Sequence, residues 1–214
     1  MIRLRMCAAL WPDKGETERR YGAYAEQEDF TMIRHSLFAL TAAFGLSACT
    51  SQPDYRAAET APPTVLQVDL TRYAGLWYEI ARYPNSFENN CAGVTAEYVQ
   101  RADGRIDVIN TCHKGSVDGP VEVAKGMARV MEQSGNARLK VKFAPSWVPF
   151  AWGDYWILHL EPDYSAVLVG DPSGKYLWIL AREKSLDAGT LARIETRAEE
   201  LGYETGPLEM TDQG

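Results

Sequence analysis

Residues 94–110 read VTAEYVQRADGRIDVIN, which is two short alternating segments joined by a turn. The charged residues Glu97 and Asp107 mark the solvent-facing side of each segment, because apolar and polar residues alternate with a period of two. The connection Ala102-Asp103-Gly104 is short enough to make the two segments antiparallel neighbours. The pattern therefore predicts a half-buried β-hairpin. Its inward face would carry Val94, Ala96, Tyr98, Ile106, Val108 and Asn110.

The same period of two extends in both directions from this hairpin, between Gly75 and Arg182, and turn residues interrupt it at short intervals. Eight sequential strands with short connections close most simply into an up-and-down barrel, which removes exposed sheet edges. We therefore predict an all-β fold, an eight-stranded antiparallel up-and-down β-barrel. The expected strands are Leu76–Tyr83, 94–98, 106–110, 124–128, 139–143, Tyr155–Leu160, Ser165–Gly170 and Tyr176–Arg182.

A single amphipathic helix is predicted after the last strand. Asp187 is a suitable N-cap and Gly202 a suitable C-cap. The residues between them place their apolar side chains at helical spacing, so one face is apolar and should pack against the outside of the barrel. That face consists of Leu191, Ile194, Ala198 and Leu201.

Composition and charge exclude some classes of partner. The chain has 214 residues and a net charge of -7, and the first 49 residues carry six basic and six acidic side chains, so the whole excess lies in residues 50–214. An acidic body lacks the basic surface that phosphate contacts require, so we expect no nucleic-acid partner. No apolar run reaches the roughly 18 residues of a membrane-spanning helix.

The N-terminal part of the chain is predicted to be a targeting segment rather than a folded domain. Residues 32–48 contain a short basic region and an apolar stretch of secretory-signal length. They end in Leu46-Ser47-Ala48-Cys49, which resembles the lipobox of bacterial lipoproteins. The resemblance implies cleavage before Cys49, lipidation of its thiol and, because Thr50 follows, an outer-membrane location facing the periplasm of a Gram-negative bacterium. A short helix ending in a buried cysteine is the alternative.

The remaining boundaries follow from that assignment. Residues 1–31 precede a complete signal with its own Met, so we interpret them as an upstream leader outside the mature protein. Residues 49–66 would be the lipidated cysteine and a flexible linker, because they are rich in Pro, Ala and Thr. Residues 67–214 would form the barrel domain.

Three separated motifs identify a family. Gly75-Leu76-Trp77 resembles the Gly-x-Trp signature that opens the first strand of lipocalins, and Asp163-Tyr164 resembles their Thr-Asp-Tyr motif, with Pro162 in place of Thr. Residues 176–182, which end in Arg182, resemble the third lipocalin motif, whose arginine packs over the Gly-x-Trp indole. In an up-and-down barrel all three fall at one end, so Gly75, Trp77, Asp163, Tyr164 and Arg182 are expected to close the base. The resemblance implies a carrier of small hydrophobic molecules.

The opposite end would be the mouth, and the barrel interior the ligand site. The inward residues on two walls are small, namely Ala96, Ala124, Gly126 and Ala128, which favours an apolar void, although opposing aromatic rings could instead fill it. The loop 145–153 carries Trp147, Phe150 and Trp152 as a lip for a ligand or membrane, or as a local cluster. The expected ligand-binding residues are Tyr98, Val108, Asn110, Ala124, Ala128, Val141, Phe143, Tyr155, Ile157, Val167 and Trp178.

Cys91 and Cys112 flank the first hairpin in an oxidising compartment, so we predict a disulfide between them. If Asp103 centres the turn, however, Cys91 lies opposite Gly115. The bridge then requires a curled loop or a β-bulge, because the Cα atoms must approach within about 7 Å.

We find no metal-ligand spacing, Gly-x-Ser-x-Gly elbow or phosphate loop, and expect neither metal nor cofactor nor enzymatic activity. The predicted function is a membrane-anchored lipocalin that stores or transports small hydrophobic ligands, such as fatty acids or lysophospholipids, in the cell envelope. Two alternatives stay open. One is a lipid-modifying enzyme with a Cys91 thiol at the mouth, and the other is an interaction module or homodimer that uses the loop 145–153.

Overall fold

The computed structural model describes residues 53–145, 147–149 and 151–214. The predicted leader, the signal peptide and the lipidation residue Cys49 lie outside the described residues. Within the described part of the chain, no helix is long and apolar enough to cross a membrane.

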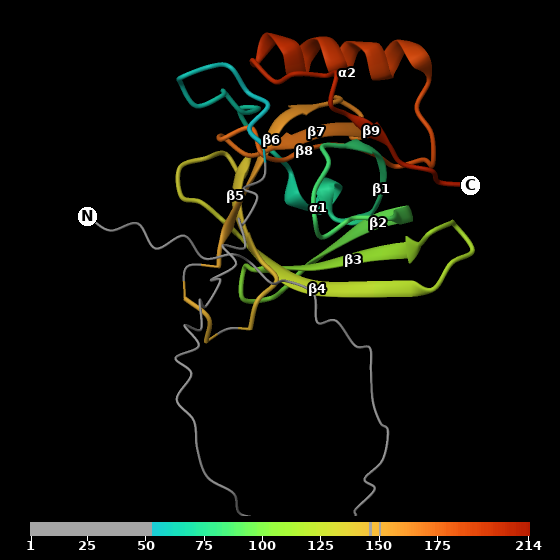
Figure 1. Cartoon of the computed structure of the whole chain (residues 1–214). Helices are drawn as coiled ribbons and strands as arrows, with labels where there is room; N and C mark the ends of the chain where they lie inside the picture. The colour runs from blue at the N-terminus through green and yellow to red at the C-terminus, as the bar shows by residue number, and fades with distance from the viewer. Residues whose placement is uncertain (1–52, 146, 150) are drawn as a thin grey trace, which may run out of the picture. The chain divides into compact units, whose positions relative to one another are not determined.

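Eight antiparallel strands form a closed barrel, as the alternating pattern predicts (Figure 1). Each strand pairs with the next along the chain, and β1 pairs with both β2 and β8, which closes the ring. A short helix, α1 (Leu70–Tyr73), precedes the barrel. The strands are β1 (Gly75–Arg82), β2 (Cys91–Gln100), β3 (Ile106–Lys114), β4 (Val121–Val130), β5 (Arg138–Lys142), β6 (Gly153–Leu160), β7 (Ala166–Gly170) and β8 (Leu177–Ala181).

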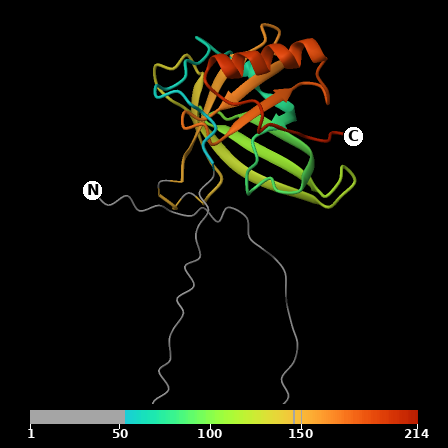
Figure 2. The same cartoon turned by 45° about the horizontal axis from the view of Figure 1, so that its top comes forward.

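The predicted amphipathic helix is α2 (Ala188–Glu200), and Asp187 caps it by accepting a hydrogen bond from the Thr190 amide. It lies outside the barrel along the wall that contains β6 and β7, while β2–β4 form the opposite wall (Figures 1 and 2). Ile194, Ala198 and Leu201 are buried beneath it. The barrel therefore has two apolar cores, one under α2 and one inside the ring of strands.

The C-terminal tail completes the barrel near its mouth, which the alternating pattern did not predict. Paired residues of β1 and β2 run only from Gly75–Tyr98 to Tyr78–Thr95. Beyond that point β9 (Glu209–Met210) pairs with β1, and the Gln213 side-chain amide donates to the Glu79 and Val94 carbonyls, one on each strand. The tail thus supplies the hydrogen bonds that the two separating strands no longer make with each other.

The segment before the barrel differs from the predicted flexible linker. Within residues 54–66, the Tyr55 amide donates to the Gly174 carbonyl at 3.0 Å, and the Val65 amide donates to the Ile157 carbonyl at 3.1 Å. The Arg56 guanidinium also reaches the Leu201 carbonyl at the end of α2. The linker interpretation is therefore wrong from about Asp54 onward, because these backbone groups find partners on the folded domain.

The first hairpin has the predicted register with one bulge. Ala96 pairs with Asn110 and Thr95 with Thr111, which places Asp103 at the centre of the turn. A shift between Ala92 and Thr95 then moves the upper part of β2 by one position. The structure joins Cys91 to Cys112, with their Cα atoms 5.4 Å apart. The bulge is what brings these two positions within bridging distance.

Candidate ligand-binding site

Most of the predicted ligand-binding residues meet inside the barrel. Tyr98, Val108, Ala128, Tyr155, Ile157 and Val167 belong to the buried inner core, and Val141, Phe143 and Trp178 pack against it while remaining partly exposed. Asn110 and Ala124 pair with each other higher on β3 and β4, on the face of Val108. Inward residues of β3–β5 are thus buried at the lower end of the barrel and half-buried towards the mouth, whereas Glu79 and Arg82 on β1 stay buried.

The lower end is filled rather than empty. A pocket lined by apolar atoms there has room for about one water molecule. Four predicted residues line it, namely Tyr98, Ala128, Val141 and Tyr155. Gly126 does not leave a void, because a Cβ there would stand 2.7 Å from both the Phe143 ring and the Lys142 carbonyl oxygen. The pocket is completed by Leu70, Tyr73, Ala74, Gln100, Ile106 and Leu139.

Sequence reasoning listed none of these six residues as ligand-binding. Ile106 was placed on the inward face of the hairpin, so the period-two signal for it was available. Tyr73 comes from α1, which was not predicted. The signal for α1 is Asp69, whose carboxylate accepts from the amides of Thr71 and Arg72 as an N-cap. A helix of four residues is too short to show an apolar period.

A chain of three tyrosine hydroxyls forms the floor of the interior. Tyr155 Oη lies 2.7 Å from Tyr73 Oη and 2.8 Å from Tyr98 Oη. Burial raises the pKa of the Tyr155 and Tyr73 hydroxyls well above the ordinary value of 10. Tyr73 and Tyr98 raise the pKa of Tyr155 further, whereas the hydrogen bond with Tyr155 lowers that of Tyr73. The floor is therefore neutral and hydrogen-bonded to itself, which allows polar groups to lie in an apolar interior.

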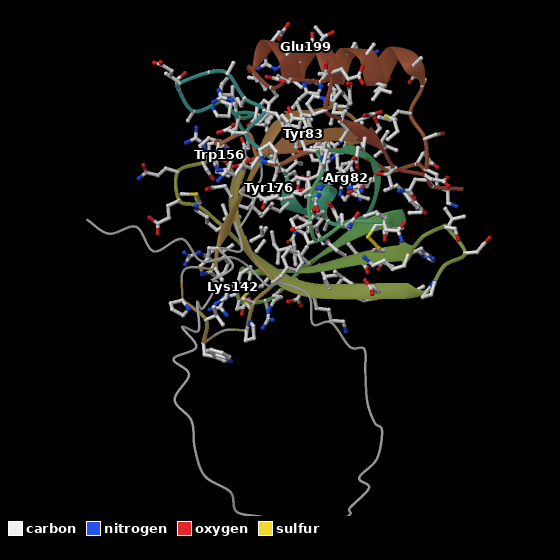
Figure 3. The ribbon with its side chains drawn as sticks, viewed as in Figure 1. Arg82, Tyr83, Lys142, Trp156, Tyr176 and Glu199 are labelled. Atoms are coloured by element: carbon white, nitrogen blue, oxygen red, sulfur yellow. A yellow bond between two sulfur atoms is a disulfide. The ribbon has the colours of Figure 1, made fainter. Side chains whose placement is uncertain are left out.

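A charged cluster lies above the floor. Arg82 is 6% exposed, and Figure 3 shows it among the strands while its neighbour Tyr83 lies nearer α2. Its guanidinium is 3.5 Å from Glu79 and 3.7 Å from Glu88. Trp178 Nε1 donates to the Glu88 carboxylate at 3.2 Å, which links the cluster to a predicted ligand-binding residue. Sequence reasoning did not select Arg82 or Glu88, because a lone Glu in a loop carries no local signal.

Glu79 is an inward-facing carboxylate on β1. The structure joins it to the C-terminal tail and to Arg82: Thr211 Oγ1 donates to its carboxylate at 2.5 Å. Burial raises the pKa of Glu79 well above its ordinary value, and the negative charge of Glu88 adds to that shift. Glu79 therefore holds a proton more tightly than an exposed carboxyl does.

The base of the barrel carries the residues expected there. Trp77 is fully buried, and the Arg182 guanidinium lies 3.8 Å from the centre of its ring. Arg182 also donates to four backbone carbonyls, those of residues 72, 73, 74 and 76. It thereby satisfies the carbonyls at the C-terminal end of α1, which have no partner within so short a helix.

The other base residues hold the start of α1. Tyr164 Oη accepts a hydrogen bond from the Asp69 amide at 2.9 Å, and Arg72 stacks over the Tyr164 ring at 4.0 Å. Asp163 accepts from Ser165 within its own turn. Gly75 has φ of +92°, a left-handed conformation that favours glycine where the chain passes from α1 into β1.

The aromatic residues of the mouth loop separate into two environments. Trp152 lies against the outside of the barrel, with the Arg129 guanidinium 4.5 Å from its ring centre. Lys142 Nζ, labelled in Figure 3, donates to the Val148 carbonyl at 2.6 Å. Trp147 is 80% exposed, and Phe150 lies outside the described residues. The loop is thus partly folded back and partly presents an indole to solvent.

The structure bears on a thiol nucleophile at Cys91 and on a metal site. Cys91 is oxidised, so the mouth offers no free thiol at this position and a Cys91 nucleophile has no basis in this state. Among the described residues, no group of three or more His, Cys, Asp or Glu side chains is arranged to hold a metal ion.

A closed eight-stranded antiparallel barrel with an Arg–Trp plug at one end is an architecture that can hold one small ligand. The family model described as a lipocalin-like domain matches residues 68–213. The chain belongs to the lipocalin family.

Several relatives and solved structures are similar to the chain. Temperature-induced lipocalin-1 of Arabidopsis thaliana is 37% identical over 68% of this chain and 80% of that protein. Outer membrane lipoprotein Blc of Vibrio cholerae is 33% identical over 81% of this chain and 95% of its own length. Insecticyanin of the tobacco hornworm Manduca sexta has the same fold, with a TM-score of 0.58 at 20% identity over 75% of this chain and 89% of that one.

Proposed function

We propose that this lipocalin is anchored to the outer membrane through Cys49 and binds the alkyl chain of a fatty acid or lysophospholipid in its barrel, to store or carry it within the cell envelope. The observation that carries the proposal is the gradient of burial inside the barrel. The inward side chains of β3–β5 are buried beside a floor at Tyr98 and Tyr155 and become half-buried towards the mouth.

The upper half of the interior suits a single alkyl chain. It is bounded by Phe143 and Trp178, which are partly exposed, and by the small residue Ala124. Because the lower pocket is narrow, the chain would lie above the tyrosine floor with its headgroup at the mouth. Each buried methylene contributes roughly 0.8 kcal/mol, so a long chain supplies a gross free energy large enough for micromolar binding after the cost of association.

The proposed location rests on the sequence at Leu46–Cys49 and on the relatives. The similar proteins of Vibrio cholerae and Escherichia coli K12 are both named outer membrane lipoprotein Blc, and the latter is 37% identical over 69% of this chain. Lipidation of Cys49 can be measured by incorporation of radiolabelled palmitate in a Gram-negative host. Cys49→Ala should abolish both the label and the outer-membrane fraction, and a labelled Cys49→Ala protein would contradict the anchor.

The ligand is tested by native mass spectrometry of the full chain purified from the envelope without delipidation. A bound single-chain acyl species would support the proposal, and its mass would name the class. A protein that arrives empty and ignores added hexadecanoate and lysophosphatidylcholine would contradict it. Trp178→Ala should weaken binding of the acyl species while the barrel stays folded, because the indole bounds the upper interior without being fully buried.

A second candidate function is association with a membrane surface or with another copy of the chain through the mouth loop. The observation that favours it is Trp147, an indole that is 80% exposed. Analytical ultracentrifugation over a range of concentrations would detect a homodimer, and binding to vesicles would detect insertion into lipid. Trp147→Ser should reduce whichever association occurs, whereas Trp152→Ser is the matched control because that ring already packs on Arg129.

A further inference from the structure

The loop between β1 and β2 places a carboxylate inside the barrel. Glu88 is 8% exposed although it belongs to a mouth loop. Its amide donates to Asn85 Oδ1 at 2.8 Å, and the Cys91 amide donates to its carbonyl at 3.2 Å. Phe87 beside it packs against the rings of Tyr176 and Trp178. The loop is thus folded so that Glu88 points away from solvent and towards the interior.

Three donors from different parts of the chain converge on this carboxylate. Trp178 Nε1 on β8 donates to Glu88 Oε2 at 3.2 Å, and Asn85 Nδ2 donates to the same oxygen at 2.5 Å. Arg82 Nε on β1 lies 3.7 Å from it. Two of the donors, Arg82 and Trp178, are fixed on strands, whereas the carboxylate itself is carried by a loop. The backbone positions of these two donors are therefore set by the strands, while Arg82 Nη2 also donates to the Glu88 carbonyl of the loop at 3.1 Å.

Arg82 is incompletely satisfied in this arrangement. Its Nε is buried and has no hydrogen-bond acceptor among the described residues. Its other carboxylate neighbours are Glu79, which lies 3.5 Å away, and Glu209, which is 53% exposed on the side chain. A buried guanidinium with a free donor favours any anion that can approach more closely than Glu88 does.

The geometry presents Glu88 rather than Glu79 to both Arg82 Nε and Trp178 Nε1. Burial and the negative charge of Glu88 raise the pKa of Glu79, so Glu79 is the carboxyl that tends to carry a proton. The charge of Glu88 also raises the pKa of the Tyr98 hydroxyl, although less than burial does. Tyr98 is part of the interior floor, so the Glu88 carboxylate acts on the same space that an alkyl chain would enter.

We propose that Arg82 Nε and Trp178 Nε1 form a carboxylate-binding site at the top of the interior, that Glu88 occupies it in the empty protein, and that the carboxylate of a fatty acid displaces Glu88 from it. This inference rests on the proposed binding of alkyl chains. A carboxylate is favoured because the group that now fills the site is a carboxylate. The displaced loop would release Glu88 to solvent, where an ionised side chain is readily hydrated.

The test compares an acid with an alcohol of the same chain length. Hexadecanoate and hexadecanol are titrated at pH 8 into the full chain and into Glu88→Gln, which keeps the size of the side chain and one acceptor oxygen but removes its charge. The variant should bind hexadecanoate at least tenfold more tightly, because the competing anion is gone. Affinity for hexadecanol should change less than twofold. Glu97→Gln on β2 is the matched control, since it removes the same charge from an exposed side chain outside the cluster and should change neither affinity.

A second readout uses the unaltered protein and does not depend on the variant. Hexadecanoate should increase amide hydrogen exchange in residues 85–91, because displacement breaks the hydrogen bonds that the Glu88 and Cys91 amides donate within the loop. Hexadecanol should not. Equal exchange with both ligands, together with an unchanged acid-to-alcohol ratio in Glu88→Gln, would overturn the carboxylate site while leaving alkyl binding intact. If Glu88→Gln bound lysophosphatidylcholine more tightly but hexadecanoate no more tightly than the unaltered protein, the carboxylate site would also be overturned.

Failure of the proposed function has a different signature. If neither hexadecanoate, hexadecanol nor lysophosphatidylcholine binds the unaltered chain or Glu88→Gln, both the alkyl-binding function and the carboxylate site are wrong.

Discussion

Removing the guanidinium of Arg182 should destabilise the barrel by about 3 kcal/mol. Arg182→Met keeps most of the apolar stem but deletes the group that stacks on Trp77 at 3.8 Å. That cation–π pair contributes about 1 kcal/mol. The half-buried hydrogen bonds to the Tyr73 and Ala74 carbonyls, at 3.0 and 2.9 Å, contribute about 1 kcal/mol each. The two more exposed carbonyls, of residues 72 and 76, can be hydrated and are not counted.

The assay is urea unfolding followed by tryptophan fluorescence, because Trp77 is fully buried and reports on the base. A loss of about 3 kcal/mol corresponds to a melting temperature roughly 10 °C lower for a domain of this size. Arg182→Lys should recover part of the loss, since it retains the charge but not the planar fork that reaches several carbonyls.

Arg193→Met on α2 is the control for Arg182→Met. Its side chain is 61% exposed and pairs only loosely with Glu161, at 3.6 Å, so its removal should change the unfolding free energy by less than about 0.5 kcal/mol. If Arg182→Met is also within 1 kcal/mol of the unaltered protein, the base is not held by this residue and the reasoning is refuted.

Three further predictions concern the interior and the mouth. Replacing Cys91 and Cys112 by Ser should cost roughly 3 kcal/mol in urea unfolding, because the bridge closes a loop of about 22 residues in the unfolded chain; an unchanged midpoint under oxidising conditions would contradict this. Tyr155→Phe should lower the free energy of unfolding by about 2 kcal/mol, more than Tyr98→Phe, because the Tyr155 hydroxyl is hydrogen-bonded to two tyrosine hydroxyls and the Tyr98 hydroxyl to one. Glu79 has a raised pKa, so the folded state holds its proton more tightly, and its contribution is lost as pH rises above about 4.5 through the folded pKa. Glu79→Gln should therefore become progressively more stable relative to the unaltered protein between pH 5 and pH 8, and a constant difference across that range would show that Glu79 does not titrate in the folded state.

The fold could be predicted from the sequence because each strand has a local sequence signal. A period of two fixes which residues face inward, and short turns fix antiparallel neighbours. The hairpin centred on Asp103 also indicated that a Cys91–Cys112 bridge needs either a curled loop or a bulge, and the structure has the bulge, between Ala92 and Thr95. The base motif at Trp77 and Arg182 was equally accessible, because two distant positions must fall at the same end of any up-and-down barrel.

The candidate site was predictable only in part. The inward residues Tyr98, Ala128, Val141 and Tyr155 follow from alternation and do line the lower pocket. How much space they leave does not follow, because side-chain volume is shared among facing strands that are far apart in sequence. Gly126 shows this, since the space beside this small residue is filled by the Phe143 ring and is not empty.

By itself, then, the sequence determined the barrel, its helix, its register and the end at which it closes. The tertiary structure alone decided that Glu88 turns into the interior, that Arg82 meets it there, and that the tail near Gln213 joins β1 to β2. The physical reason is the range of the interactions. Strand patterning is enforced by each residue's own neighbours, whereas a loop or tail takes whichever position lets its polar groups find partners, and those partners exist only once the barrel has assembled.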